Sequence, residues 1–481
     1  MNFANRFAKI NFLFVLILVF GFILRIYKLP EIFTLDGDIA RDWLVIFEAW
    51  KAKKPILVGP LASFAGIFNG PWYYYTMAPV VIASKLNPLA IISFSLFLGL
   101  LEIFLIYKVA QKVFGQKVAL VVGFFYTLSY SAIKISHALW NPNFLPVLTL
   151  IILYFLIEAV QGKKVSKLVS GLITAGFGLQ FHYGFALIIP AILWVTRKLA
   201  FIRHYRRGLV LAVLAIFAMF LPLLVFELRH GFVMSQTFIL YQSTGRGGSI
   251  TDFFNNLILA QPFRHLFAML FTTNLRPILA WLVLVFLLFG YLRLKKISEN
   301  EKIIWQFFFI TLFLFMLAPL TVHQYYLNPL LPVAFLLFGS LLARLQKPYF
   351  FLVVTALVIL FFTVLVKSDT WQTSSRNRSA QQSVSQIIAS DFPINNQFNI
   401  VNFGHRPFHS AWEYRFLVRN LGFKSLGADQ YNRASVLYLI SEGPMETPLK
   451  AQSYETSQFG PDKVEKTWKL ENGWQVFKLI K

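Results

Sequence analysis

The sequence predicts an all-α polytopic membrane protein of about eleven transmembrane helices, followed by a small soluble α/β domain. Of its 481 residues, 57% are hydrophobic and only 14% are charged, and the mean hydropathy is +0.62. This composition lies outside the range of soluble globular proteins. Uncharged apolar runs recur as far as Val366, and the composition becomes mixed from Ser368 onward. We therefore expect a transmembrane domain over residues 1–367 and a soluble domain over residues 368–481.

Most of the ten apolar runs have the length of about 20 residues that a helix needs to cross a bilayer. The run Leu168–Thr196 is too long for one untilted helix and carries the polar insert Gln180–Gly184 at its middle, so we interpret it as two short spans around a tight turn. Eleven spans result. The runs are Ile10–Leu24, Pro88–Tyr107 (interrupted by Glu102), Val118–Ile133, Asn143–Ile157, Leu168–Thr196, Gly208–Phe226, Pro277–Leu292, Ile303–Val322, Tyr325–Ala343 and Pro348–Val366.

The basic residues support this topology. With the N-terminus in the cytoplasm, every short inner segment carries Lys or Arg, as the positive-inside rule requires. These residues are Arg6, Lys9, Lys108, Lys112, Lys117, Lys163, Lys164, Lys167, Arg197, Lys198, Arg203, Arg206, Arg207, Arg293, Lys295, Lys296, Lys302, Arg344 and Lys347. The opposite loops at His182 and His323 carry neither Lys nor Arg. The pattern predicts a multi-pass protein of the plasma membrane, with the first loop and the C-terminal domain outside the cytoplasm.

The formal net charge of +24 thus mostly reflects the basic residues that orient the helices in the membrane. The expected partner is therefore membrane lipid and not nucleic acid. The chain has no cysteine, which excludes disulfides, zinc–thiolate sites, Fe–S clusters and thiol nucleophiles.

Two predicted outer loops are long and have some structure of their own. In the first, about Pro30 to Asn87, the segment Pro71–Ser84 is apolar but too short to cross the bilayer, so it predicts an interfacial helix. The second runs from Arg229 to about Leu275. In the C-terminal domain, alternating patterns predict strands, and helical patterns predict helices. The strands are expected at Phe398–Phe403 and Ser435–Ile440, and the helices at Ala380–Ala389 and Trp412–Leu421.

Acidic residues gather just after the first span. Of the eleven acids before residue 368, five lie between Glu31 and Glu48, and the core of this cluster is Leu35–Trp43. A purely structural interpretation is a solvated loop followed by a surface helix that Asp36 or Asp38 caps, with Arg41 in an exposed ion pair. Asp36-Gly37-Asp38 spells the Asp-x-Asp of nucleotide-sugar enzymes, but it lacks their βαβ context.

Four features together resemble the GT-C superfamily, the multispanning glycosyltransferases that use polyprenyl-phosphate sugars. They are the Asp-x-x-Arg of Asp38 and Arg41, the Pro-aromatic segment Gly70–Tyr75, the Asn141-Pro142 pair, and the Tyr-Tyr-x-x-Pro-x-x-Pro of Tyr325–Pro332. The superfamily includes protein mannosyltransferases and the aminoarabinose transferases of lipid A. The resemblance implies that Asp38 is the catalytic carboxylate, and Asp36 is the second candidate.

The chemistry of sugar transfer suits these residue types. A carboxylate within hydrogen-bond reach of the acceptor hydroxyl can take its proton, and cations stabilise the departing phosphate. Arg41 suits the second role because its guanidinium is planar and permanently charged. Metal dependence varies across the superfamily, so no cofactor is firmly expected and a divalent metal stays possible.

Further candidates lie at the predicted outer ends of spans, where the superfamily has its substrate contacts. They are Asn141, His182, Tyr183, His323, Tyr325 and Tyr326, and each has an alternative interpretation as an interfacial anchor or helix cap. Arg246, in the glycine-rich segment 241–250, is a candidate phosphate contact. Glu102 lies inside a span, where an acid is either functional or part of a structural polar contact.

These observations predict an inverting glycosyltransferase that moves a sugar from a polyprenyl-phosphate donor to a hydroxyl of a lipid, glycan or protein acceptor at the outer face. A lipid-linked sugar flippase or other transporter is the main alternative. Transporters concentrate broken helices and charges near mid-membrane, whereas the polar residues here lie at the outer boundary. A polysaccharide polymerase or ligase shares the expected geometry and differs in how many sugars the donor carries.

Overall fold

The computed structural model describes residues 12–62, 66–202, 204–243, 249–294, 297–391, 397–404 and 410–481. Their contacts divide the chain into two compact units. The first unit contains the chain up to Tyr27, Ile56–Thr76 and Ile92–Thr370, and the second contains Lys28–Pro55, Met77–Ile91 and Trp371–Lys481. We describe each unit by itself.

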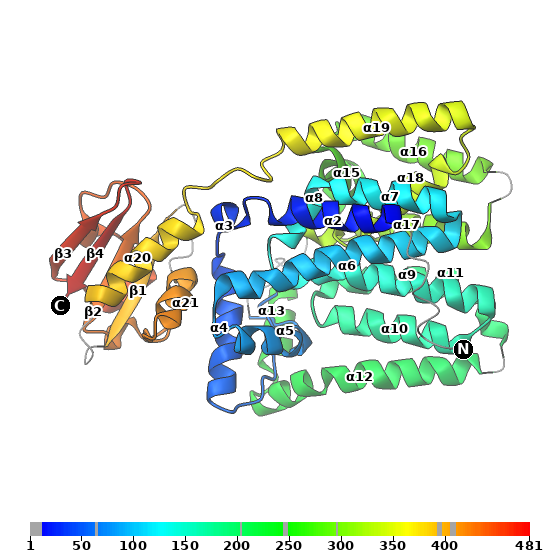
Figure 1. Cartoon of the computed structure of the whole chain (residues 1–481). Helices are drawn as coiled ribbons and strands as arrows, with labels where there is room; N and C mark the ends of the chain where they lie inside the picture. The colour runs from blue at the N-terminus through cyan, green and yellow to red at the C-terminus, as the bar shows by residue number, and fades with distance from the viewer. Residues whose placement is uncertain are drawn as a thin grey trace. The chain divides into compact units, whose positions relative to one another are not determined.

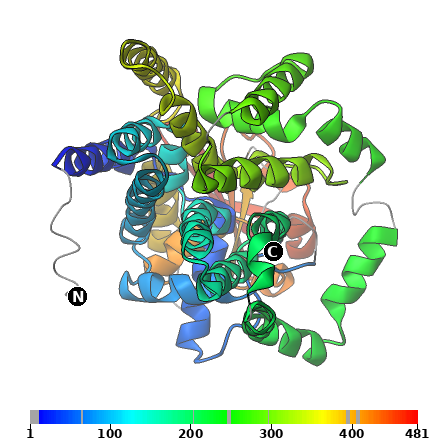
Figure 2. The same ribbon diagram turned by 90° about the vertical axis from the view of Figure 1, so that its right-hand side faces the viewer.

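The first unit is a bundle of helices that run alongside one another, and Figure 2 views many of them nearly end-on. The helices of the bundle in Figure 1 are α2 (Phe12–Ile26), α6 (Pro88–Phe114), α7 (Gln116–Leu128), α8 (Tyr130–Ser136), α9 (Leu145–Gly162), α10 (Val165–Leu179), α11 (Ile189–Val195), α12 (Tyr205–Arg229), α16 (Pro277–Arg293), α17 (Glu299–Met316), α18 (Leu330–Leu342) and α19 (Lys347–Lys367). Further elements lie between them: η1 (Asn141–Phe144), η2 (Tyr183–Ile188), η3 (Arg197–Phe201), α13 (Val233–Ser243), α14 (Ile250–Leu257), α15 (Gln261–Phe271) and η4 (Gln324–Leu327).

The burial of these helices fits a bilayer environment. The span that contains α9 is 72% buried within the protein, whereas the more apolar spans of α12 and α19 are only 6% and 17% buried. An apolar helix with so little protein around it needs hydrocarbon as its surroundings. Among the described residues, four helices are long and apolar enough to cross a membrane, or five if the bent pair α7–α8 is one span. The multi-pass membrane protein is thus confirmed, and the count of eleven spans stays a prediction.

The break predicted within Leu168–Thr196 is present. Helix α10 ends at Leu179, and the chain turns at His182 before η2 and α11. Both of these elements pack back against α10. The polar insert therefore separates two short helices, as expected from its sequence.

Ion pairs join the predicted inner segments to one another. Lys112 at the end of α6 pairs with Glu158 near the end of α9. Lys198 on η3 lies 3.1 Å from Glu299 at the start of α17. Arg344 after α18 pairs with Glu301, which also accepts a hydrogen bond from the Ser340 hydroxyl. The basic segments thus meet at one end of the bundle.

The second unit contains a mixed four-stranded sheet in the order β1-β2-β4-β3. Strand β1 (Phe398–Phe403) runs parallel to β2 (Val436–Ser441), which pairs antiparallel with β4 (Gln475–Ile480), and β4 pairs antiparallel with β3 (Lys463–Lys469). One face packs on α20 (Arg378–Asp391) and α21 (Trp412–Asn420), and the other on η5 (Tyr431–Arg433) and α22 (Tyr454–Phe459). The turn η6 (Pro448–Lys450) precedes α22. The predicted α/β domain and its predicted strands and helices are confirmed.

The segment that follows the first helix belongs to this second unit. It contains α3 (Leu29–Ile32) and α4 (Gly37–Lys51), and α4 packs along α21. The ring of Trp43 meets that of Phe416 edge-on at 5.5 Å. The short helix predicted at Pro71–Ser84 is present as α5 (Trp72–Ala83). The domain boundary after residue 367 and the interfacial position of α5 stay predictions.

Two antiparallel segments precede α5, and their close backbone contact depends on a glycine. The N–H of Gly59 donates to the Asn69 carbonyl at 2.8 Å, and the N–H of Asn69 donates to the Pro60 carbonyl at 2.8 Å. A Cβ atom at Gly59 would overlap the backbone of Gly70. Side-chain rearrangement cannot relieve such a contact, because backbone atoms form it.

We therefore expect Gly59→Ala to lower the midpoint temperature of thermal unfolding of the purified protein. Overpacking of this kind lowers the free energy of unfolding by about 1–3 kcal/mol. Gly290→Ala is the matched control, because a Cβ atom at this helical position of α16 meets only open space within 4 Å. Circular dichroism melts in detergent compare the two variants. Equal melting of Gly59→Ala and Gly290→Ala would contradict the predicted backbone contact.

Candidate active site

The first group of candidate residues lies at the N-terminus of α4, in the second unit. Asp36 has an extended backbone (φ −81°, ψ 145°), and its carboxylate accepts a hydrogen bond from the N–H of Asp38 at 2.9 Å. An aspartate in this position satisfies a backbone donor that the helix leaves unpaired. The capping predicted for Asp36 is thus confirmed.

Asp38, Arg41 and Asp42 form a chain of ion pairs on the first turn. The Arg41 Nη1 atom lies 2.8 Å from Asp38 Oδ1, and its Nη2 atom lies 3.1 Å from Asp42 Oδ1. The side chain of Asp42 is fully buried, that of Arg41 is 20% exposed, and that of Asp38 is 55% exposed. The buried Asp42 therefore anchors the guanidinium, and Asp38 is the carboxylate that a substrate can reach.

Asp36, Asp38 and Asp42 are the acids that would have to bind a divalent metal at this helix turn. Arg41 already lies between Asp38 and Asp42, and one Asp36 oxygen accepts the capping hydrogen bond. In the part of the chain that the structure describes, no three His, Cys, Asp or Glu side chains are arranged to hold a metal ion. As arranged, these acids form no ligand set for a metal, and we derive no chemical step through one.

The second group of candidates gathers in the first unit, around the turn at His182 and the element η4. The His182 ring meets the Tyr326 ring at 4.6 Å and the Tyr325 ring at 5.6 Å. The His323 ring stacks on Tyr325 at 5.6 Å, and Trp140 adjoins the same tyrosine at 4.7 Å. Segments distant in sequence thus build one aromatic and imidazole cluster, which we call the His182 cluster: His182, His323, Tyr325 and Tyr326.

The protonation of His182 follows from its surroundings. Burial, reinforced by the nearby charge of His323, lowers the pKa of His182 to about 4. The imidazole is therefore neutral at physiological pH. Its Nδ1 atom accepts the N–H of Gly184 at 3.1 Å, so the ring proton lies on Nε2. His182 is thus a neutral hydrogen-bond donor and a weak base.

Two other candidates use their polar groups to hold the backbone of this region. The Asn141 amide donates to the carbonyl of Phe181 at 2.6 Å, and the Tyr183 hydroxyl donates to the carbonyl of Phe68 at 2.6 Å. Both bonds brace the turn at His182, a structural role that differs from the interfacial anchor or helix cap considered for these residues. Arg246 lies outside the described residues.

Two basic residues near the cluster were not predicted as candidates. Arg264 and His265 lie on α15, which packs against η4. Burial lowers the pKa of His265, and the charges of Arg264 and His323 lower it further. A sequence signal was available, because Arg264 is a basic residue in a predicted outer loop, where the positive-inside rule expects few.

Glu102 has identifiable partners within the bundle. The hydroxyl of Tyr126 donates to its carboxylate at 2.7 Å, and the buried Arg25 guanidinium interacts with it electrostatically. The His137 ring lies nearby, with its Nε2 atom 2.9 Å from the Arg25 carbonyl. Pairing of this kind is what a charge inside a membrane helix requires. This arrangement corresponds to the structural polar contact that was one of the two expectations for Glu102.

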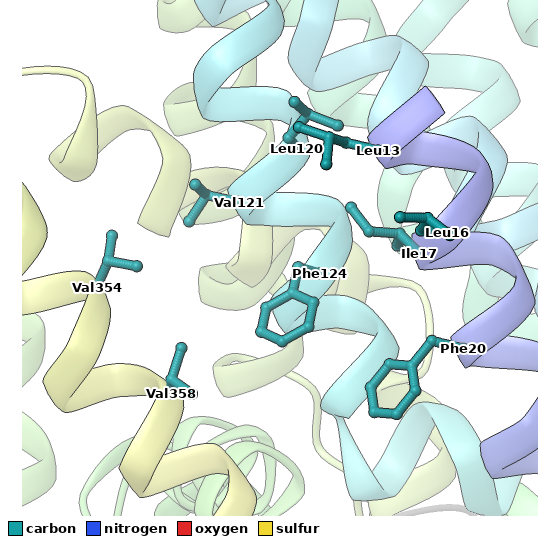
Figure 3. A pocket seen from close by; sticks show the side chains of 9 residues that line it. All are labelled: Leu13, Leu16, Ile17, Phe20, Leu120, Val121, Phe124, Val354 and Val358. Carbon is teal, nitrogen blue, oxygen red and sulfur yellow. The ribbon is translucent and has the colours of Figure 1, made fainter. Parts of the chain in front are cut away.

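An apolar groove of about 410 Å³ opens between α2, α7 and α19. Figure 3 shows its lining, which consists of Leu13, Leu16, Ile17, Phe20, Leu120, Val121, Phe124, Val354 and Val358. All nine side chains are hydrocarbon. A groove of this composition suits an alkyl or isoprenoid chain.

Comparison with known proteins supports the expected family. Residues 69–227 match the family model of dolichyl-phosphate-mannose-protein mannosyltransferases. This stretch contains Asn141, His182 and Tyr183, and it lies outside the segment of Asp38. Among curated proteins, no sequence matches the chain.

Two solved structures resemble the chain along most of its length. ArnT from Cupriavidus metallidurans, bound to undecaprenyl phosphate, superposes with a TM-score of 0.62 at 13% identity, over 96% of this chain and 97% of ArnT. An Archaeoglobus fulgidus oligosaccharyltransferase, solved with zinc and sulfate, gives a TM-score of 0.53 at 13% identity, over 89% of this chain and 68% of that protein. Residues 69–227 thus match a family model of mannosyltransferases, and the chain has an ArnT-like fold over nearly its whole length, in agreement with the resemblance that its sequence predicted.

Proposed function

We propose that this protein transfers a sugar from a polyprenyl-phosphate donor to an acceptor hydroxyl, with inversion at the anomeric carbon. The observation that carries the proposal is an accessible carboxylate, Asp38, held by Arg41 at a helix N-terminus within a GT-C fold. A carboxylate of this kind suits a general base. The acceptor is a lipid, a glycan or a protein.

The proposed reaction needs one proton transfer and one displacement. Asp38 takes the proton of the acceptor hydroxyl as its oxygen forms a bond to the anomeric carbon. The bond between that carbon and the phosphate oxygen breaks, and polyprenyl phosphate leaves with the electron pair. Because the phosphate ester is a good leaving group, no general acid is required. Arg41 orients Asp38 and brings positive charge to this surface.

The lipid-phosphate donor is proposed from the relatives and from this chain's own surfaces. The ArnT structure holds undecaprenyl phosphate, and the matching family model is named for dolichyl-phosphate-mannose. The groove between α2, α7 and α19 offers hydrocarbon contact to a long chain. We assign the His182 cluster, together with Arg264, to binding of phosphate or sugar hydroxyls, since imidazole, phenol and guanidinium groups all donate hydrogen bonds.

Asp38→Asn is expected to lower the transfer rate by about 10²- to 10⁴-fold, the range that general-base catalysis contributes. The assay uses purified protein, a panel of radiolabelled polyprenyl-phosphate sugars and crude membrane acceptors. Asp36→Asn should transfer at nearly the wild-type rate, because asparagine caps a helix as well as aspartate does. Glu31→Gln is the matched control, an exposed acid of the same segment.

A wild-type rate in Asp38→Asn would remove Asp38 from the mechanism. If only Asp36→Asn loses activity, the base is Asp36 instead. No transfer with any donor, together with translocation of lipid-linked sugar in liposomes, would identify a transporter.

Replacing His182 by phenylalanine removes a neutral donor and is expected to raise the KM for the lipid donor. A hydrogen bond to a charged group is worth about 1.5–3 kcal/mol, so the increase should be about 10- to 100-fold. His204→Phe is the matched control, because His204 is exposed at the start of α12. Since the pKa of His182 is about 4, its contribution to donor binding should not change between about pH 5 and 8. Equal KM values for the two variants would contradict the assignment.

We propose that the first loop and the C-terminal domain lie outside the cytoplasm. An alkaline phosphatase reporter fused after Lys481 should then be active in intact cells, because this enzyme folds only outside the cytoplasm. The same reporter fused after Arg344, a predicted inner position, should be inactive. Activity at Arg344 alone would reverse the proposed orientation.

A further inference from the structure

A buried glutamine of the C-terminal domain holds the backbone just before the proposed base. Gln381, on α20, is fully buried. Its side-chain nitrogen donates to the Leu35 carbonyl at 2.9 Å, and its side-chain oxygen accepts the Leu35 N–H at 3.1 Å. One amide side chain thus satisfies both backbone groups of the residue that precedes Asp36.

This double hydrogen bond matters because Leu35 lies in a connection between helices. The residues from Phe33 to Asp36 are neither helical nor in a strand. Phe33 still bonds back to α3 and Asp36 bonds forward to α4, so Leu35 lies between the last bond of one helix and the first bond of the next. Buried backbone groups without partners are costly. The Gln381 amide bonds the N–H and the C=O of Leu35, as the backbone of a neighbouring strand would. These two bonds fix the direction in which the chain enters α4.

Other contacts join the same segment to the C-terminal domain. The N–H of Arg378 donates to the Phe33 carbonyl at 2.9 Å. At the far end of α4, Glu48 pairs with Arg419 at 2.6 Å and with Lys424 at 2.8 Å. The segment is thus attached before Asp36 and again near the end of α4.

The C-terminal domain also contacts Gly37, which lies between Asp36 and Asp38. A Cβ atom at Gly37 would lie 3.1 Å from a carboxylate oxygen of Glu413, so only glycine lets Glu413 approach without displacement. Glu413 lies 3.1 Å from Arg376, which also lies 2.9 Å from Glu442. An ion-pair network of the C-terminal domain therefore packs against the residue between Asp36 and Asp38.

We propose that Gln381 is a positioning residue: by holding Leu35, it orients the N-terminus of α4 and with it the carboxylate of Asp38. The inference rests on the proposed base role of Asp38 and extends it to the C-terminal domain. That domain becomes part of the catalytic apparatus. Gln381 acts through the backbone and not through contact with substrate.

The test replaces Gln381 by methionine, which keeps the length of the side chain and removes both hydrogen bonds. Gln386→Met is the matched control, because Gln386 is an exposed glutamine on the same helix. Ser385→Ala is a second control, a buried change one turn away whose hydroxyl bonds only the Gln381 carbonyl among the described residues. Two measurements compare the full-length variants: steady-state transfer, and hydrogen exchange of peptides covering residues 33–42.

We expect Gln381→Met to lower kcat by about 10- to 100-fold, the loss that a small misplacement of a catalytic group can cause. The KM values for donor and acceptor should change less than twofold. A smaller folded fraction would also lower kcat at constant KM, so hydrogen exchange in the sheet separates general destabilisation from misplacement of Asp38. Exchange should accelerate in residues 33–42 and stay unchanged in β1 and β2. Both controls should match the wild type. If the Gln381→Met variant does not fold, the same two measurements are made on Gln381→Asn. This substitution shortens the side chain by one methylene and so moves the amide away from Leu35.

A Gln381 variant with the kcat of Gln386→Met would overturn the inference, whether or not exchange accelerates. Unchanged exchange in residues 33–42 would overturn it as well. Failure of the proposed function looks different: the wild type would then transfer no sugar, or Asp38→Asn would be fully active. In that case the exchange measurement still decides whether Gln381 holds the segment.

Discussion

The lack of water in bilayer hydrocarbon is the constraint on which this structure depends. Each backbone N–H and C=O that faces lipid must find its partner within the chain, and helices are the solution that a single segment can provide. The apolar helices α12 and α19, with little protein around them, meet this requirement directly. Polar side chains are costly in such helices, and this is why Glu102 lies with Tyr126 and Arg25.

The same constraint directs the proposed chemistry to the ends of the helices. The His182 cluster forms where α10 gives way to a turn and where η4 precedes α18. The Phe181 carbonyl, in the turn after α10, accepts a hydrogen bond from Asn141, and Tyr183 in the same turn donates to the Phe68 carbonyl. Side chains that first resemble substrate contacts therefore brace the loop backbone, and the neutral His182 is left as a donor.

In the second unit, the C-terminal sheet with its helices and the acidic segment around α4 form one compact body. The sheet and its helices provide a surface on which α4 rests, and the buried Asp42 fixes Arg41, which in turn fixes Asp38. A reactive carboxylate at a helix N-terminus needs such support, because loops alone hold geometry poorly. The proposed role of Gln381 extends this chain of contacts into the C-terminal domain.

Local features of the sequence alone determined much of this protein. Long apolar runs predicted the helices, and the insert at Gln180–Gly184 predicted the break after α10. The sequence also predicted that Asp36 or Asp38 caps the following helix, because hydropathy and capping act over a few residues, and the structure selected Asp36. The partners of Glu102, the group formed by His182 with Tyr326, and the position of Arg264 and His265 beside that group needed the tertiary structure. So did the hydrogen bonds between Leu35 and Gln381, which are 346 positions apart. Contacts of this kind depend on how distant segments pack, and no local pattern encodes that packing.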